Sequence, residues 1–322
     1  KMKKNIAVVG CGYWGKNLVR NFAELGSLAA ICDPDDELAK KYSKKFSTKN
    51  MSFKELCKDK SIQGIVLAVP ASLHSSMAID AMKNHKHVFV EKPLAMNQSE
   101  ARKMIDASRE NNVKLMVGHL LQYHPVFKKI KEIVNLNIIG KLNYIYSNRL
   151  SLGKLRTVED VIWSFAPHDI SMILSLAKDN PVYVQARTAN TIQTNIADHS
   201  IISMKFQSGL KAHIFSSWLH PYKEQKLVVT GEFGILEFND TKDWNEKLSI
   251  LFYEKETIKG NLSLKLLEQK FIETEETEPL KNECIHFSEV VNNGISPDTD
   301  GTEGLNVLKV LTMATKSASE GF

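Results

Sequence analysis

The chain has 322 residues, of which 43% are hydrophobic and 25% are charged. These values are typical of soluble globular proteins and exclude a disordered, collagen-like or disulfide-scaffold chain. At roughly 100 to 200 residues per domain, the length predicts two domains. No apolar run approaches the roughly 20 residues of a membrane-spanning helix, so no membrane association is expected.

The charge and the cysteines exclude several kinds of site. The net charge is +5, but basic clusters such as Lys40-Lys41 lack interleaved aromatic residues and any DNA-binding motif, so we expect no nucleic-acid partner. The four cysteines show no C-x-x-C spacing, and His85 and His87 have no third ligand nearby, so neither disulfides nor a metal site is expected. The short basic N-terminal segment runs into a glycine turn, which favours a cytoplasmic protein.

The first part of the chain alternates short apolar strands with amphipathic helices. We expect strands at 5–9, 28–32, 64–68, 87–91 and 114–117. We expect helices at 16–25, 36–46, 73–82 and 98–111, the last with Asn97 as its N-cap. This alternation predicts a parallel sheet wrapped by helices over residues 1–118.

The pattern changes after Gly118. A helix at 126–134 is followed by alternating strands at 141–150, 182–188, 199–206, 211–218, 226–230 and 235–238. Further helices are expected at 167–176, 280–291 and 304–317, and residues 266–278 are expected to form an edge strand and loop. Residues 119–322 are therefore predicted to form an α+β domain on an open, mostly antiparallel sheet.

The strongest local signal is the segment 10–15, which reads Gly-Cys-Gly-Tyr-Trp-Gly and lies between the first strand and the first helix. Gly10 permits the tight turn, Gly12 lets the backbone approach a pyrophosphate, and Gly15 allows close packing of helix on strand. We include Tyr13 and Trp14 of this loop among the cofactor-binding candidates. In this context the motif predicts a Rossmann dinucleotide-binding domain.

Asp33 lies at the end of the second strand, where a carboxylate can accept hydrogen bonds from the ribose hydroxyls. The same carboxylate would repel a 2′-phosphate, and the residues that follow supply no arginine. We therefore expect NAD as the cofactor rather than NADP.

Glu91-Lys92-Pro93 ends a buried strand, and ligands bind at the carboxyl ends of strands in open parallel sheets. A lysine desolvated beside a nicotinamide ring would have a lowered pKa suited to proton transfer. The alternative is a surface lysine paired with Glu91. Pro70 and His74 follow the preceding strand in the same crevice, where His74 either contacts the cofactor or caps and packs.

The segment 163–171 begins the expected helix of the second domain. Proline favours the first helical turn, so Pro167 would place His168 at the helix N-terminus, where the macrodipole favours a neutral imidazole. Asp169 in the first turn would be stabilised by the same field. The alternative is a helix cap with a buried histidine.

These residues together resemble the Gfo/Idh/MocA family of oxidoreductases. The resemblance covers nearly the whole chain and rests on the glycine motif, Glu91-Lys92-Pro93, the His168-Asp169 pair and the C-terminal pattern from Phe287 to Gly301. It implies hydride transfer between a sugar or cyclitol carbon and NAD, with Lys92 and His168 as catalytic residues. It also implies a homodimer or homotetramer that forms through the open sheet.

The segments 148–150 and 163–171 resemble the branch that oxidises C3 of UDP-N-acetylglucosaminuronate in surface-polysaccharide pathways. The candidate substrate-binding residues are Gln122, Tyr123, Arg149, Arg156, Trp163 and His168, with Lys154 as a further cation beside the arginines. Arginine can bind a uronate or a diphosphate through two parallel hydrogen bonds, although scattered surface cations or packing residues would look the same in sequence.

One position departs from the family pattern. Family members often carry an aspartate four residues before the histidine, and this chain has Ser164 there. The departure puts the orientation of His168 in doubt and leaves Lys92 as the principal acid/base. The alternatives are an inositol dehydrogenase, a ketosugar reductase or a non-catalytic NAD-binding sensor.

Overall fold

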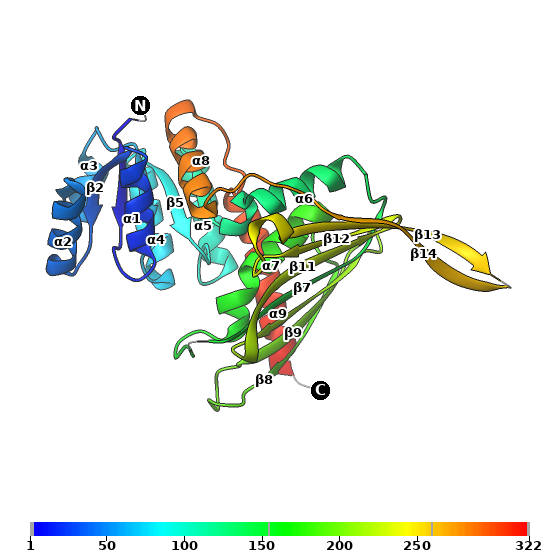
Figure 1. The fold of residues 1–322 in the computed structure, drawn as a ribbon. Coiled ribbons are helices and arrows are strands. Elements are labelled where there is room, and N and C mark those ends of the chain that lie inside the picture. Colours follow the sequence, from blue (N-terminus) through cyan, green and yellow to red (C-terminus); the bar gives the residue numbers. More distant parts are fainter. Residues whose placement is uncertain (1–2, 154, 259, 321–322) are drawn as a thin grey trace. The chain divides into compact units, whose positions relative to one another are not determined.

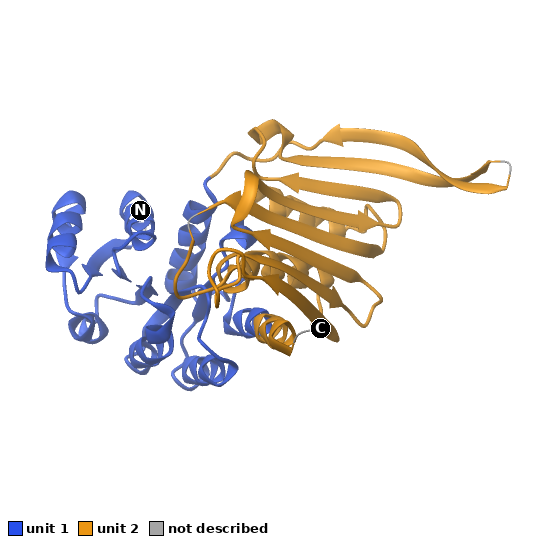
Figure 2. Ribbon diagram, turned by 90° about the horizontal axis from the view of Figure 1, so that it is seen from below, with its two compact units in different colours: residues 1–123, 278–308 blue, residues 124–277, 309–322 orange. Residues whose placement is uncertain are grey.

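The computed structural model describes residues 3–153, 155–258 and 260–320. The chain forms two compact units (Figure 2). Unit 1 comprises residues 1–123 and 278–308, and unit 2 comprises residues 124–277 and 309–322. The division differs from the expected boundary because residues 278–308, which we assigned to the second domain, return to the N-terminal unit.

Unit 1 is built on a six-stranded parallel sheet with the strand order β3-β2-β1-β4-β5-β6 (Figure 1). The strands are β1 (Ile6–Val9), β2 (Leu28–Cys32), β3 (Lys49–Asn50), β4 (Gly64–Leu67), β5 (His87–Glu91) and β6 (Leu115–Gly118). The expected Rossmann fold is confirmed, although the two-residue strand β3 and the short helix Phe53–Lys58 were not predicted from the sequence. Buried β-branched runs such as that of β4 suit strands that are covered on both faces.

Unit 1 also contains the following helices. They are α1 (Gly15–Glu24), α2 (Asp36–Phe46), α3 (Phe53–Lys58), α4 (Ala71–Lys83), α5 (Gln98–Glu110), the 3₁₀ helix η1 (Leu120–Tyr123) and α8 (Pro279–Asn293). Asn97 caps α5 as expected, because its side chain accepts a hydrogen bond from the backbone N–H of Glu100.

Helix α8 belongs to unit 1 because its apolar side packs on the parallel sheet. The Phe287 ring makes edge contacts with Phe22 of α1 and Phe89 of β5, at centroid distances of 6.3 and 5.5 Å. A Cβ atom at Gly64 of β4 would lie 2.7 Å from Val291, so the helix and the strand are in close contact. This segment therefore completes the core of a domain that begins some 280 residues earlier in the chain.

Unit 2 contains an eight-stranded sheet with the order β14-β13-β12-β11-β7-β10-β9-β8. The strands are β7 (Leu142–Leu152), β8 (Tyr183–Ala189), β9 (His199–Lys205), β10 (Lys211–Ser217), β11 (Leu219–Gly231), β12 (Gly234–Asn239), β13 (Leu248–Ile258) and β14 (Asn261–Phe271). Neighbouring strands pair antiparallel except β7 and β10, which pair parallel. The expected, mostly antiparallel sheet is confirmed.

Three helices, α6 (Pro125–Asn135), α7 (Val161–Ala177) and the C-terminal part of α9 (Gly301–Glu320), lie on one face of this sheet in unit 2 (Figures 1 and 2). The other face is open, and the side chains alternate accordingly. In β9, Ser200, Ile202 and Met204 are buried, whereas Ile201 and Ser203 are exposed.

The boundary of α7 differs from the expected one. The helix begins at Val161, and the Asp160 side chain caps it by accepting a hydrogen bond from the backbone N–H of Trp163, at 3.0 Å. Pro167 therefore lies inside the helix and not in its first turn. The argument that a helix N-terminus favours neutral His168 is wrong, because the N-terminal field falls off within about the first turn.

Candidate active site

The glycine loop lies between β1 and α1. Gly10 has a φ of +92°, and a Cβ atom there would lie 2.3 Å from the carbonyl oxygen of Ala68. A Cβ atom at Gly15 would lie 1.9 Å from the carbonyl oxygen of Gly10. No atom lies within 4 Å of a Cβ built at Gly12 among the described residues, so the backbone there is open to a phosphate.

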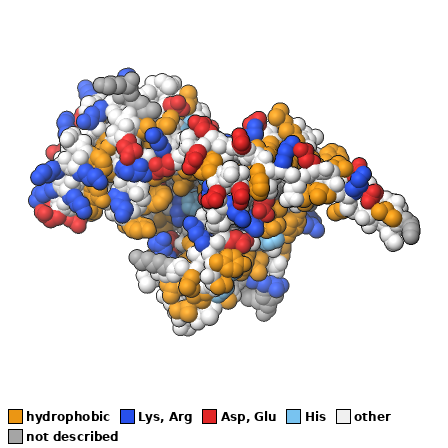
Figure 3. Space-filling model, in the orientation of Figure 1, with side chains coloured by type: hydrophobic (Ala, Val, Ile, Leu, Met, Phe, Trp, Pro, Cys, Tyr) orange, Lys and Arg blue, Asp and Glu red, His pale blue; other side chains and the backbone are white. Residues whose placement is uncertain are grey.

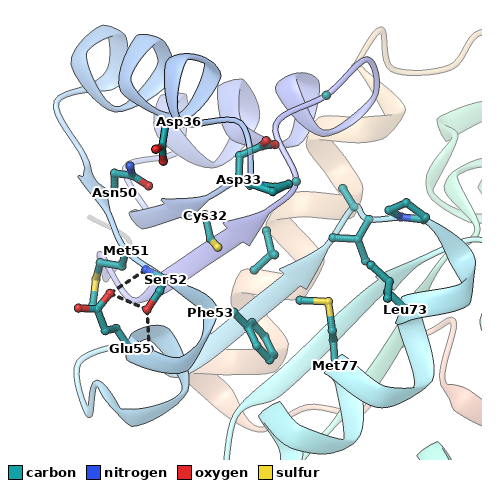
Figure 4. A pocket seen from close by; sticks show the side chains of 17 residues that line it. Cys32, Asp33, Asp36, Asn50, Met51, Ser52, Phe53, Glu55, Leu73 and Met77 are labelled. Carbon is teal, nitrogen blue, oxygen red and sulfur yellow. Dashed lines mark hydrogen bonds between the residues drawn. The ribbon is translucent and has the colours of Figure 1, made fainter.

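A cleft of about 660 Å³ opens beside this loop at the carboxyl ends of β1, β2 and β4 (Figure 4). The residues that line it include Gly10, Gly12, Asp33, Asp36, Ser52, Phe53, Pro70, Leu73 and Met77. The glycines, Asp33 and Pro70 were predicted from the sequence, whereas the walls from α3 and α4 were not. Ser52 and Glu55 hydrogen-bond to each other in a capping box at the start of α3. This sequence signal could have predicted α3, which forms one wall of the cleft.

Asp33 joins this cleft to the glycine loop. Its Oδ2 atom accepts a hydrogen bond from the backbone N–H of Cys11 at 2.6 Å, and its Oδ1 atom accepts one from Asp35 at 2.9 Å. A carboxylate has about four acceptor positions, so two remain for ribose hydroxyls. The open backbone at Gly12, the negative Asp33 and the apolar walls together fit a dinucleotide without a 2′-phosphate.

Glu91 and Lys92 lie at the carboxyl end of β5, also in unit 1. The Glu91 carboxylate is 9% exposed, and its Oε1 atom accepts a hydrogen bond from the indole N–H of Trp14 in the glycine loop, at 2.6 Å. The bond ties the end of β5 to the cofactor loop. Lys92 is half-buried, and Tyr13 is 84% exposed.

His74 is buried in α4, and both of its ring nitrogens face backbone carbonyl groups. Nδ1 lies 2.8 Å from the oxygen of Pro93, and Nε2 lies 2.9 Å from the oxygen of Val69. Burial lowers the pKa of this imidazole. His74 therefore holds the segment after Lys92 against the start of α4, while the cofactor contact that we considered for it stays a prediction.

Tyr123 and Gln122 are buried in η1. The Tyr123 hydroxyl is 2.8 Å from the hydroxyl oxygen of Thr299, and burial raises its pKa well above the ordinary value. Tyr123 is thus a core residue whose hydroxyl is bonded inside the fold, and its contact with a substrate stays a prediction. His119 of the same segment forms an ion-pair contact with Glu303 at 2.5 Å.

In unit 2, His168 is half-buried in α7 and Asp169 is fully buried. The Asp169 carboxylate accepts two hydrogen bonds from the Arg149 guanidinium, at 2.6 and 3.1 Å, and another from the Ser147 hydroxyl. Burial alone would lower the pKa of Arg149, but Asp169 raises it. Arg149 therefore fixes α7 to β7 through its paired guanidinium, and its anion-binding role stays a prediction.

The remaining substrate candidates lie near the start of α7 in unit 2. Arg156 is exposed and lies 3.8 Å from Glu159. The indole of Trp163 donates to the hydroxyl of Thr315 at 3.0 Å, and Ser164 is buried. Lys154 lies outside the described residues.

Two further properties of the described residues bear on function. No helix among them is long and apolar enough to cross a membrane. No group of three or more His, Cys, Asp or Glu side chains in the described part of the chain is arranged to hold a metal ion.

Comparisons with known proteins agree with this geometry. Residues 4–119 match the family model described as "Oxidoreductase family, NAD-binding Rossmann fold", and residues 127–237 match the GFO/IDH/MocA C-terminal domain. The UDP-N-acetylglucosamine 3-dehydrogenase of Acidithiobacillus ferrooxidans is 24% identical over 72% of this chain and 73% of its own length. Its solved structure superimposes with a TM-score of 0.86 over 98% of both chains, at 21% identity.

Two other similar proteins have different substrates in their names. The myo-inositol 2-dehydrogenase of Thermotoga maritima is 23% identical over 98% of this chain and 96% of its own length. A levoglucosan dehydrogenase, solved with NADH and levoglucosan, has a TM-score of 0.84 and 19% identity over 98% of this chain and 97% of its own. With both domains matched, the chain belongs to the Gfo/Idh/MocA family of oxidoreductases and carries the family's NAD-binding Rossmann domain.

Proposed function

We propose that this chain is an NAD-dependent dehydrogenase that moves a hydride between a secondary hydroxyl of a sugar or nucleotide sugar and nicotinamide. The observation that carries the proposal is Lys92, a half-buried lysine at the carboxyl end of β5, next to a glutamate that is bonded to the cofactor loop. Ligands bind at the carboxyl ends of the strands in an open parallel sheet, so the position of Lys92 suits proton exchange with an alcohol.

In this proposal, each of the following residues has its own role in binding or proton transfer. NAD, when bound, supplies the hydride acceptor. Gly12 and the start of α1 hold the pyrophosphate, and Asp33 holds the adenine ribose. Lys92 takes the proton of the substrate hydroxyl at its Nζ atom, and His168 serves as a second proton carrier. Asp33 also gives NAD its advantage over NADP, because it would repel a 2′-phosphate.

The best substrate candidate is a UDP-N-acetylglucosaminuronate-like nucleotide sugar oxidised at C3, which would place the chain in the synthesis of surface polysaccharides. The similarity to a UDP-N-acetylglucosamine 3-dehydrogenase supports this choice. Arg156 is the cation proposed for the acidic part of the substrate, since it is exposed and its contact with Glu159 is long. Gln122 and Trp163 remain proposed pocket residues. An inositol dehydrogenase is the second candidate, supported by the full-length similarity to such an enzyme.

The test is an oxidation assay with purified protein, in which nicotinamide absorbance is followed with NAD or NADP and with UDP-N-acetylglucosamine, its uronate, myo-inositol and glucose. We expect turnover with NAD and a nucleotide sugar. Lys92→Ala should lower kcat by about 10²- to 10⁴-fold, the usual contribution of acid–base catalysis, and leave the Kd for NAD nearly unchanged.

The matched control is Lys86→Ala, at a lysine that is buried at the other end of β5 and bonded to backbone carbonyls. That change should affect stability and leave kcat unaltered in the folded protein. Equal losses of NAD binding and turnover in Lys92→Ala would show a structural lysine and contradict the proposal. Binding of NAD without turnover on any substrate would favour a sensor.

We also propose that copies of the chain associate through the open face of the unit 2 sheet. Tyr144, Tyr146 and His213 form an aromatic group on this face, with the Tyr144 hydroxyl 2.7 Å from His213 Nδ1 and the Tyr146 ring stacked on His213 at 5.3 Å. Partly exposed aromatic side chains are enriched in protein interfaces. A sedimentation measurement of the wild-type protein against Tyr146→Lys tests this association.

A further inference from the structure

The last two strands of unit 2 continue past the sheet as a narrow ribbon. Strand β12 pairs with β13 only as far as Phe252. Beyond that point, residues 253–258 of β13 and 261–266 of β14 pair with each other and with no other described strand. Figures 1 and 2 both show this ribbon, here named the arm, projecting beyond the other strands of the sheet. A two-stranded ribbon alone is at best marginally stable in water, so a covering partner is expected.

The two faces of the arm differ in character. Leu262, Leu264 and Leu266 lie on one face and are 73%, 64% and 57% exposed. The opposite face carries the ion pair between Lys265 and Glu254, at 2.8 Å. Figure 3 shows hydrophobic and charged side chains side by side along the arm. A row of exposed leucines is typical of an interaction surface.

Strand β14 is also the edge of the eight-stranded sheet. Its outer backbone N–H and C=O groups therefore face no other strand of the described chain. A long, exposed edge with apolar side chains is a template for pairing with another strand, whereas proline, a short edge, bulges or charged side chains, lysine above all, discourage such pairing. Strand β14 runs for 11 residues and contains no proline.

The order of side chains along β14 makes this edge complementary to itself. Leu266 lies opposite Tyr253 and Glu268 opposite Phe252, so Leu267 is an extra residue in a bulge. The bulge reverses the alternation, and Lys265 and Glu268 consequently lie on the same face.

A second β14, laid antiparallel about a twofold axis between residues 266 and 267, places Lys265 of each copy opposite Glu268 of the other. It also places Leu262 opposite Phe271, which is 57% exposed and lies on the leucine face. Directly opposed, oppositely charged side chains stabilise antiparallel pairs, and a twofold axis makes each contact twice.

We propose that β14 pairs edge to edge with β14 of a second copy of this chain, so that the two eight-stranded sheets become continuous. We propose a second copy as the partner because the charged and apolar side chains of β14 are complementary to those of another β14 in antiparallel orientation. The proposal goes beyond the oxidoreductase chemistry and does not depend on it. It is also separate from association through the open face, since it uses the edge of the sheet.

Charge reversal tests the proposal. Lys265→Glu and Glu268→Lys each place like charges opposite one another at two symmetric points, so each should weaken association by about tenfold or more. The double variant Lys265→Glu/Glu268→Lys restores opposite charges between copies, although each chain loses its own ion pairs at both positions. We expect the double variant to assemble like the wild type. Sedimentation velocity over a wide range of protein concentration measures all three.

The matched control is Lys255→Glu, the same substitution on the inner strand of the arm, where it should leave the assembled mass unchanged. A second variant, Leu262→Ser/Leu264→Ser, should lower the assembled mass, while circular dichroism shows that the fold is retained. A wild type that stays monomeric at every concentration, or a double variant no better than the single ones, would overturn the proposal. Turnover and NAD affinity of the same variants are measured in separate assays. The assembled mass therefore tests the pairing of β14 even if no dehydrogenase activity is found.

Discussion

At the scale of single residues, unit 1 contains a buried carboxyl group, that of Glu283, with no hydrogen-bond partner among the described residues. Glu283 of α8 is fully buried, and both of its carboxyl oxygens lack a donor. Burial, and next the negative charge of Glu91, raises the pKa of Glu283 well above its ordinary value. The physical reason is that an ionised carboxylate without a partner is costly in a low-dielectric interior, so the neutral acid is favoured.

This burial predicts a pH-dependent effect of Glu283→Gln on stability. An acid with a raised pKa in the folded state stabilises the fold below its unfolded pKa, and that contribution is lost as the pH rises above about 4. Glutamine resembles the neutral acid in size and cannot ionise. The free energy of unfolding of the variant should therefore equal that of the wild type near pH 4. At pH 8 it should exceed the wild-type value by on the order of 1 kcal/mol, as measured by urea unfolding. The exposed Glu289→Gln on the same helix is the control, and equal pH profiles for both variants would contradict the argument.

At the scale of elements, helix α7 shows how a capping residue can outweigh a proline signal. From the sequence, this helix was expected to begin at Pro167, because proline favours the first turn. The structure begins it at Val161, where Asp160 caps the helix and Ser164 and Trp163 fall within its first turn and a half. An aspartate before an apolar run is a start signal in its own right, and it was available in the sequence.

The position of this cap can be tested by mutation. Asp160→Ala should lower the free energy of unfolding by about 1 kcal/mol, because the first-turn N–H groups lose their acceptor. Asp160→Asn should retain most of the stability that the cap contributes, because asparagine also caps helices. The measurement is chemical denaturation with far-ultraviolet circular dichroism. If the helix started at Pro167, residue 160 would lie in a loop and the alanine variant would unfold like the wild type.

At the scale of the whole molecule, the chain leaves unit 1 at Tyr123 and returns to it at Glu278. Helix α8 then covers the sheet beside α1, where Arg20 pairs with Glu278 at 2.5 Å. Unit 1 is therefore discontinuous in sequence, although its first 118 residues carry a complete Rossmann pattern. Sequence periodicity identifies most of these elements, but it carries no information on which sheet a distant helix covers.

This arrangement predicts that a fragment of residues 1–123 is not a stable domain. Without α8, the core residues Phe22, Phe89 and Tyr123 would be exposed to solvent on one face of the sheet. Such a fragment should bind a hydrophobic dye and unfold at a temperature well below that of the full chain. Adding residues 278–308 through a short flexible linker should restore a cooperative transition. A fragment that melts like unit 1 of the intact protein would contradict this account.

The amino-acid sequence by itself determined the parallel strands, the glycine loop, the position of Asp33 and Lys92 at strand ends, and the family. Those features are local patterns, in which hydrophobic period, glycine spacing and capping act over a few neighbouring residues. Only the tertiary structure decided that Arg149 is paired with Asp169, that His74 and Tyr123 are used inside the fold, and that α8 completes unit 1. Those outcomes depend on contacts between residues far apart in the chain, and a side chain's type does not reveal which partner already occupies it.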